Sequence, residues 1–333
     1  VVFFFFVLVV FVFGVVLFLL LTKTPATHGY PVCFNLCLYN KTYFLFYNIL
    51  AKIFLTSDKR KQHNLKKVKM IMSDYFSVPG LFVFIVGACI GSFLNVCIYR
   101  IPENNSIITP GSFCPNCNKN IPFYYNIPIL SYVFLMGRCK FCKHPISIRY
   151  LLIEALTGIF ALLLFHKFGL TPAMAYWFVF ISVLITISFI DIDHQIIPDI
   201  ISLPGILIFA SSFCFLPEMT IKDALLGILA GGGSLYAVAL FYYLLKKQEG
   251  MGGGDIKLLA MIGAATGIKG VIFTIFAGSL FGTIFGILIM VYTKIADTKL
   301  RIPFGPFLSL GVILYIFFGK QLVQWYLSTL AIN

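Results

Sequence analysis

Charged residues are scarce in this sequence. Only 11% of its 333 residues are Asp, Glu, Lys or Arg, whereas 60% are hydrophobic and the mean hydropathy is +0.96. Soluble domains carry about 25% charged residues, so this composition excludes an ordinary water-soluble protein. Several apolar runs approach or exceed the length of about 20 residues that a helix needs to cross a bilayer. The sequence therefore predicts an all-α polytopic membrane protein.

Acidic residues are fewer than basic ones, and the basic residues are unevenly distributed. The formal net charge is +13, but nine of the 25 Lys and Arg residues lie in the first 69 positions. From Met70 onward there are 16 basic and 11 acidic residues, and the basic excess is confined to a few loops. Lys and Arg in short loops set the orientation of membrane helices. We therefore expect membrane lipid around this protein and no nucleic acid as a partner.

Methionine is absent before Met70. Residues 1–21 are apolar and long enough to span a membrane, but they lack the basic start of a signal peptide. A basic stretch, residues 58–69, then leads to Met70. We expect residues 1–72 to be a doubtful N-terminal extension that arises from a wrongly assigned start. A real additional membrane anchor is the alternative.

About eight transmembrane helices are expected after this extension. The apolar spans are 78–97, 150–165, 172–190, 200–216, 224–245, 256–268, 270–293 and 304–318. They define a first transmembrane helix in 73–97, a small loop domain in 98–149 and a membrane domain in 150–327. The loop carries six basic residues against Glu103 alone, which places it in the cytoplasm. Small residues spaced for close helix approach are Gly227, Gly231, Gly232, Gly233, Gly278, Gly282 and Gly286.

Acids beside apolar runs are the main candidates for chemistry, since no Ser, His and acid constellation and no phosphate-binding glycine loop stands out. The first cluster consists of Asp191, Asp193 and Asp199. The second is Asp255, which follows Gly252, Gly253 and Gly254 and precedes Lys257. Two crossings separate the loop 98–149 from Asp191, and two more separate Asp191 from Asp255. All three sites are therefore expected on one face of the membrane.

Asp191 and Asp255 are our candidates for a catalytic pair. Two carboxylates a few ångströms apart share one proton, so one can activate a water while the other protonates the carbonyl or the leaving amine. Asp193 is either a supporting acid or a solvated one, and a helix cap is the favoured role for Asp199. The alternative for Asp255 itself is a helix cap after a glycine loop. The glycines 252–254 and Lys257 complete the supporting residues.

Four cysteines in the loop 98–149 have the spacing of a zinc site. They are Cys114, Cys117, Cys139 and Cys142, in two Cys-x-x-Cys pairs separated by 21 residues. This spacing is close to that of a four-thiolate zinc ribbon, and such a site has no open position for water. We therefore expect a structural zinc ion. Glu154, one turn after Arg149, could pair with it, fill a network inside the bundle or contact the substrate, and a structural role is the favoured one.

In combination, these motifs resemble the bacterial type IV prepilin peptidases over residues 73 to about 325. The matching stretches are 91–96 with Arg100 and Pro102, the two cysteine pairs, 147–150 with Glu154, 191–199, and 252–257. The resemblance implies that Asp191 and Asp255 are the catalytic aspartates. It implies cleavage of prepilin and pseudopilin leaders at the cytoplasmic side of the inner membrane, commonly between Gly and Phe. It also implies methylation of the new N-terminus by S-adenosylmethionine.

The residues that bind this cofactor are not apparent from the sequence, and the loop 98–149 with Asn95 and Arg100 at its root is the expected region. Two other classes of function remain open. A proton-coupled transporter would use membrane carboxylates, but it typically has inverted halves and acids near mid-membrane. A zinc-ribbon scaffold without catalysis would explain the cysteines and leave both acid motifs without a role. The sequence leaves open the pilin or secretion system that is served, and the oligomeric state.

Overall fold

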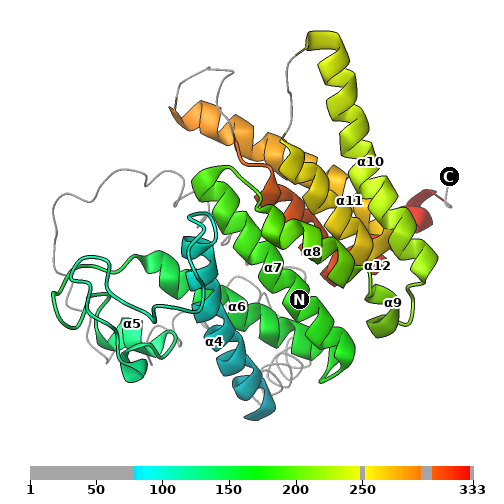
Figure 1. Ribbon diagram of the computed structural model, residues 1–333. Helices are drawn as coiled ribbons and strands as arrows, with labels where there is room; N and C mark the ends of the chain where they lie inside the picture. The colour runs from blue at the N-terminus through cyan, green and yellow to red at the C-terminus, as the bar shows by residue number, and fades with distance from the viewer. Residues whose placement is uncertain (1–77, 248–251, 294–301, 331–333) are drawn as a thin grey trace, which may run out of the picture. The chain divides into compact units, whose positions relative to one another are not determined.

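The computed structural model describes residues 78–247, 252–293 and 302–330, and these are mostly helical (Figure 1). The elements are α4 (Val78–Arg100), η1 (Phe123–Tyr125), α5 (Leu130–Phe134), α6 (Ile148–Phe168), α7 (Pro172–His194), α8 (Asp199–Phe209), α9 (Ser212–Phe215), α10 (Ile221–Lys246), α11 (Gly253–Thr293) and α12 (Gly305–Leu330). Within these ranges there is no β-strand, and β-type pairing is limited to two isolated bridges in the loop after α4. The predicted all-α class is confirmed. The doubtful extension 1–72 lies outside the described residues.

Five of the described helices, α4, α6, α7, α10 and α11, are long and apolar enough to cross a membrane. The predicted count of eight crossings is therefore not confirmed. The predicted span 200–216 is instead divided between α8 and the single turn of α9, both too short to cross. The predicted spans 256–268 and 270–293 belong to one element, α11, which is interrupted at Gly267 with φ 68° and ψ −173°. Only glycine adopts this conformation readily, so the chain can change direction there.

Close packing of α10 against α11 depends on glycine, as predicted from the small residues. A Cβ atom added to Gly227 would lie 2.1 Å from the carbonyl oxygen of Gly263, and one added to Gly231 would lie 2.3 Å from that of Leu259. No side chain fits at such separations, so the two backbones can meet only because both α10 positions lack one. Gly233, in contrast, has nothing within 4 Å of an added Cβ.

The central helix of the described bundle is α7, which packs against α4, α6, α8, α9 and α12. Its start is defined by Thr171, whose hydroxyl accepts from the Met174 N–H, and by Pro172 in the first turn. Its end is defined by Gln195, which is in the left-handed region with φ 55°. The side chains of its second half are largely buried, including Ile187 and Ile190. An acid in the last turn of this helix is consequently held at a fixed place.

Candidate active site and metal-binding loop

Asp191 lies in the last turn of α7 and is 5% exposed. Its Oδ2 accepts a 2.9 Å hydrogen bond from the main-chain N–H of Gly305, the first residue of α12. Free N–H groups at the start of a helix are suited to a carboxylate. A Cβ atom added to Gly305 would lie 2.7 Å from this oxygen, so the contact requires glycine. Gly305 was not predicted as a site residue, although its position between Pro303 and Pro306 marks a special turn.

Asp255 lies in the first turn of α11 and is half-buried. Its carboxyl group is close enough to Asp191 to interact with it electrostatically. Gly254, directly before it, packs against Ile197, because an added Cβ would lie 2.8 Å from the Ile197 Cβ. Ile197 also borders Gly305, since its Cδ1 would lie 3.5 Å from a Cβ there. The structure thus brings together the two predicted acids and the segments that carry them.

The other two glycines of the motif have a different environment. Gly252 and Gly253 are exposed, and nothing lies within 4 Å of a Cβ added to either. The main-chain carbonyl of Gly252 accepts a 3.2 Å hydrogen bond from the Asp255 N–H. The described part of the chain therefore does not crowd these two residues.

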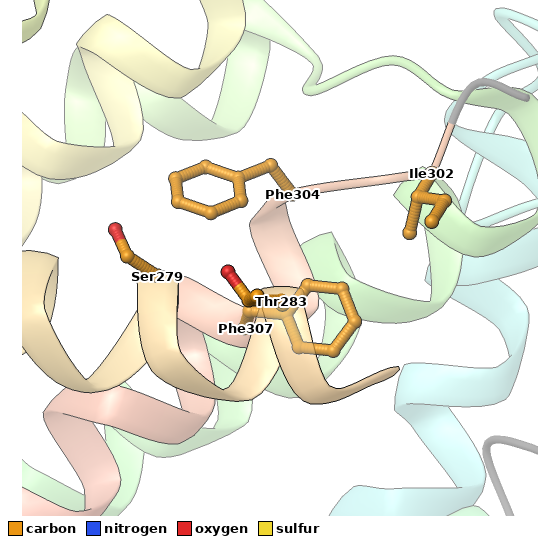
Figure 2. Close-up of a pocket in the computed structure, with 6 residues that line it drawn as sticks. Ser279, Thr283, Ile302, Phe304 and Phe307 are labelled. Carbon is orange, nitrogen blue, oxygen red and sulfur yellow. The ribbon is translucent and has the colours of Figure 1, made fainter. Parts of the chain in front are cut away.

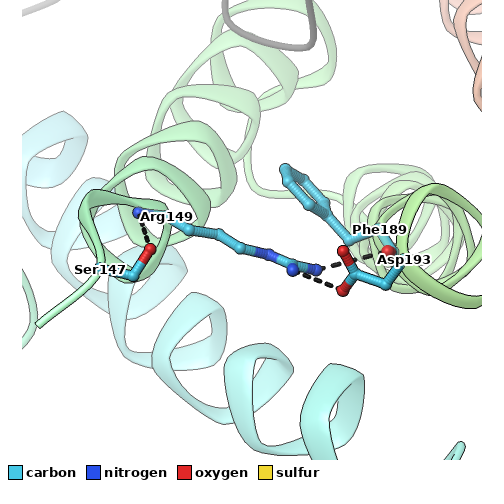
Figure 3. Close-up of polar contacts among 4 residues, drawn as sticks. All are labelled: Ser147, Arg149, Phe189 and Asp193. Atoms are coloured by element: carbon cyan, nitrogen blue, oxygen red, sulfur yellow. Dashed lines mark hydrogen bonds and ion pairs between the residues drawn. The ribbon is translucent and has the colours of Figure 1, made fainter. Parts of the chain in front are cut away.

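Asp193 forms an ion pair with Arg149, the second residue of α6 (Figure 3). The same guanidinium group donates to the carbonyl oxygen of Phe189 over 3.3 Å and lies 5.0 Å from the centre of the Phe189 ring. Arg149 therefore binds the last turn of α7 through three contacts. Because α6 begins where the cysteine loop ends, this pair also confirms that the loop and Asp191 lie at one end of the helices.

Asp199 does not cap a helix, contrary to the favoured expectation. It is the first residue of α8, and the preceding cap position is Pro198, which makes no side-chain capping bond. Instead its Oδ1 accepts a 2.6 Å hydrogen bond from Lys257 Nζ, and the Asp199 side chain is 58% exposed. The pair links the start of α8 to α11. An ion pair this exposed contributes at most about 1 kcal/mol to stability.

Buried polar residues at the root of the loop bond to the protein itself. Glu154 Oε2 accepts a 2.8 Å hydrogen bond from the Ile129 N–H, and Arg149 pairs with Asp193 rather than with Glu154. Asn95 donates to the Tyr150 carbonyl, and Arg100 donates to the carbonyls of Ser106 and Gly111. These side chains hold the loop on the bundle.

The two cysteine pairs form matching turns. In the first, the N–H of Cys114 donates to the Lys119 carbonyl and the N–H of Asn118 to the Cys114 carbonyl. In the second turn, the N–H of Cys139 donates to the His144 carbonyl and the N–H of Lys143 donates to the Cys139 carbonyl. Asn118 and Lys143 both have positive φ angles, 52° and 59°. The turns therefore present their thiols in the same way.

The four thiol sulfurs lie within 4.8 Å of one another, and Cys114 Sγ is 3.8 Å from Cys142 Sγ. A tetrahedral ion with Zn–S bonds of about 2.3 Å places its sulfurs about 3.8 Å apart. The His144 N–H and the Asn116 amide lower the pKa of the Cys142 thiol to about 6, which favours the thiolate form that binds metal. This donor set fits zinc.

A cavity of about 300 Å³ lies between the second half of α11 and the segment before α12 (Figure 2). Its lining residues are Ser279, Gly282, Thr283, Ile302, Phe304 and Phe307. Phe304 directly precedes Gly305, the residue that donates to Asp191. The cavity and the acid pair therefore share one short segment of chain. The sequence did not predict this cavity, because its two walls are distant in the chain and individually unremarkable in composition.

These features define a polytopic helical membrane protein in which two carboxyl groups meet at one end of the helices. Residues 85–168 match the Bacterial Peptidase A24 N-terminal domain, and residues 178–287 match the Type IV leader peptidase family. The chain belongs to the type IV leader peptidase family, as its resemblance in sequence predicted.

Curated relatives named prepilin leader peptidase/N-methyltransferase support this membership. The one from Aeromonas salmonicida (strain A449) is 35% identical over 289 residues, which are 77% of this chain and 95% of that protein. The one from Myxococcus xanthus (strain DK1622) is 37% identical over 230 residues, 67% of this chain and 69% of that protein. The one from Neisseria gonorrhoeae is 35% identical over 263 residues, which are 71% of this chain and 88% of that protein. No solved structure matches this chain significantly.

Proposed function

We propose that this protein is a membrane peptidase that cleaves the leader from type IV prepilins and pseudopilins and then methylates the new N-terminus. The observation that carries the peptidase role is the placement of Asp255 beside Asp191, which Gly305 holds by a main-chain hydrogen bond. The relatives' names support both reactions. Five long apolar helices support a multi-pass protein of the inner membrane.

The mechanism follows from two carboxyl groups that hold one proton between them. The ionised group takes a proton from a water, and the water oxygen bonds to the carbonyl carbon of the scissile peptide. The protonated group gives its proton to the carbonyl oxygen. The intermediate then collapses, the carbon–nitrogen bond breaks, and a proton passes to the departing amine. The Gly305 N–H fixes one oxygen of Asp191 and leaves the other for this reaction.

The supporting residues position this pair. Arg149 and Asp193 hold the last turn of α7, and Asp199 with Lys257 links α8 to α11. The open space at Gly252 and Gly253 would let a substrate strand lie beside Asp255. We assign zinc to Cys114, Cys117, Cys139 and Cys142, where it would crosslink the two turns of the loop and provide no site for water.

S-adenosylmethionine is the methyl donor that the family resemblance implies. Asn95 and Arg100, the residues expected near it, donate to carbonyl groups of the protein itself. The described cavity has no charged lining residue to pair with this ligand. Neither these two side chains nor this cavity therefore indicates where the cofactor binds, and the peptidase reaction needs none.

We further propose that the end of the bundle with the acid pair faces the cytoplasm, because the loop beside it is rich in Lys and Arg. The regions 73–97, 98–149 and 150–327 would then be a first transmembrane helix, a zinc-binding loop domain and the peptidase domain. Incubation of the purified protein with a prepilin tests the function by the loss of mass on cleavage. An unchanged substrate would instead favour a transporter or a scaffold without catalysis.

A further inference from the structure

The short helix α5 begins alongside the first turns of α6 rather than beyond the end of that helix. The N–H of Ile129, the residue before α5, donates to Glu154 Oε2 over 2.8 Å. Glu154 lies in the second turn of α6, and side chains lean toward the start of their helix, so its carboxyl group is about 4–9 Å inward from that start. Because the 21 residues of α6 are about the number that a helix needs to cross a bilayer, α5 begins at the depth of the membrane interface.

The contacts of α5 determine which of its faces points away from α6. The Tyr132 hydroxyl donates to the Ile146 carbonyl over 3.2 Å, so Tyr132 faces the segment that leads into α6. The side chains on the other face are apolar and more than half exposed, and Met136 just after the helix shares this property. These residues, which we call the apolar face of α5, are Leu130 (53%), Val133 (59%), Phe134 (78%) and Met136 (85%).

The charged residues that follow this apolar face are all basic. Arg138 and Lys140 are exposed and follow Met136 within four positions. No Asp or Glu occurs between Asn120 and Ser147. Anionic lipid headgroups attract Lys and Arg side chains that lie near the membrane surface. A bilayer that contains anionic lipid therefore complements both the apolar face and its basic border.

We propose that α5 is an interfacial helix, whose apolar face inserts among lipid acyl chains while Arg138 and Lys140 contact anionic headgroups. Helices of this kind bury their apolar face about 5–10 Å into the boundary between headgroups and acyl chains, which agrees with the depth of the Glu154 contact. The inference is independent of the proposed peptidase function. The loop 98–149 is then attached to the membrane at three places, which are its two ends and α5.

Val133→Trp and Phe134→Trp test the proposal, because each places a fluorescent ring on the apolar face of α5. Asn120→Trp is the matched control, which places the same ring at an exposed position of the loop outside α5. The full-length proteins are reconstituted into bilayers that contain anionic lipid, and the emission of the unaltered protein, with its two native tryptophans, is subtracted. Lipids brominated in their acyl chains quench from the membrane, and iodide quenches from water. A thermal unfolding assay confirms that each variant is folded.

We expect brominated lipids to reduce the added emission of Val133→Trp and Phe134→Trp by at least about twofold, and iodide to leave it nearly unchanged. Asn120→Trp should show the reverse. Equal quenching by lipid in Asn120→Trp would overturn the assignment to α5. Quenching of the two α5 rings by iodide alone would overturn the insertion itself, and its relief on addition of a prepilin would assign the face to a protein partner. Quenching by neither reagent would show that protein covers the face, which also overturns the proposal.

The basic border is tested in the Val133→Trp protein by the further changes Arg138→Glu and Lys140→Glu. Anionic headgroups repel the two introduced acids, so quenching by lipid should fall and quenching by iodide should rise. The same quenching before and after these two changes would overturn the role of the two cations.

Discussion

The main-chain N–H of Gly305 donates to Asp191 Oδ2 over 2.9 Å, and these two residues are 114 positions apart in the chain. The bond joins the last turn of α7 to the first residue of α12. Asp191 therefore depends on packing between two helices for its orientation. Changes at the contact should affect the reaction before they affect the fold.

Gly305→Ala should lower the rate of prepilin cleavage by about 100-fold, the effect expected when a catalytic group is misplaced by about 1 Å. The new methyl carbon would lie 2.7 Å from Asp191 Oδ2, so the carboxyl group or α12 must shift. Initial rates on a prepilin measure the effect. Gly233→Ala, which adds the same methyl group to open space, is the control and should keep the original rate. Normal cleavage by Gly305→Ala would show that this contact does not position Asp191.

Asp191→Asn and Asp255→Asn should each lower prepilin cleavage by several orders of magnitude, because either change removes the acid and base partnership. Asn is nearly the same size as Asp, so both variants should remain folded in a thermal unfolding assay. Glu103→Gln is the control, since Glu103 is an exposed residue of the loop after α4 and bonds only to the nearby Asn105, so this variant should retain activity within about threefold. If one of the two active-site variants cleaves normally, the assigned pair is wrong and Asp193 becomes the candidate.

Arg149→Asp and Asp193→Arg should each reduce prepilin cleavage by about tenfold, because each places like charges together beside the Asp191 turn. The double variant restores opposite charges and should recover most of the lost rate. A double-mutant cycle on kcat/KM measures this coupling. If the loss of kcat/KM in the double variant equals the two single losses combined, the pair does not position α7.

The protein should contain one zinc ion per chain, which metal analysis can measure after purification without chelators. Cys139→Ser should release the ion and make the loop sensitive to proteolysis, because the bound metal supplies much of the folding free energy of a small domain. Cys89→Ser is the control, since Cys89 lies on α4 outside the cluster. Protein that is folded and free of zinc would refute the assignment.

Asp255→Asn should still methylate a synthetic mature peptide that begins with Phe. Methyl transfer needs a cofactor near the free amine but no proton shared between Asp191 and Asp255. Transfer of a labelled methyl group is measured in the variant and in the unaltered protein. Loss of both activities in the folded variant would show that the two reactions share one site.

Local patterns explain which parts of this site could be predicted from the sequence. The cysteine cluster depends on short spacings, and each of its turns is closed by hydrogen bonds within six residues. Apolar length likewise predicted α4, α6, α7 and α10. The sequence also placed a break between the spans 256–268 and 270–293, within two residues of the interruption of α11, but it did not identify Gly267 as the residue that makes it, because only its φ of 68° distinguishes this glycine from the others of the spans.

Contacts between distant segments could not be predicted in this way. A pair with Glu154, five residues away, was one of the expected contacts of Arg149, but Arg149 pairs with Asp193, 44 residues away. The cap expected for Asp199 was wrong, since Pro198 holds the cap position of α8 and the Asp199 carboxylate instead accepts from Lys257 of another helix. In both cases tertiary packing determines which partner a side chain meets, and helix periodicity carries no information about it.

The partner of Asp191 is an amide of the main chain, so side-chain replacement cannot delete it. An alanine scan would report crowding at Gly305 and would miss the donor itself. Replacement of that amide by an ester, through a hydroxy acid introduced at position 305, would remove the N–H and leave the space unchanged. Among the natural residues only proline also lacks this N–H, and any side chain at position 305 would crowd Asp191 Oδ2, so ordinary mutation cannot test the hydrogen bond by itself.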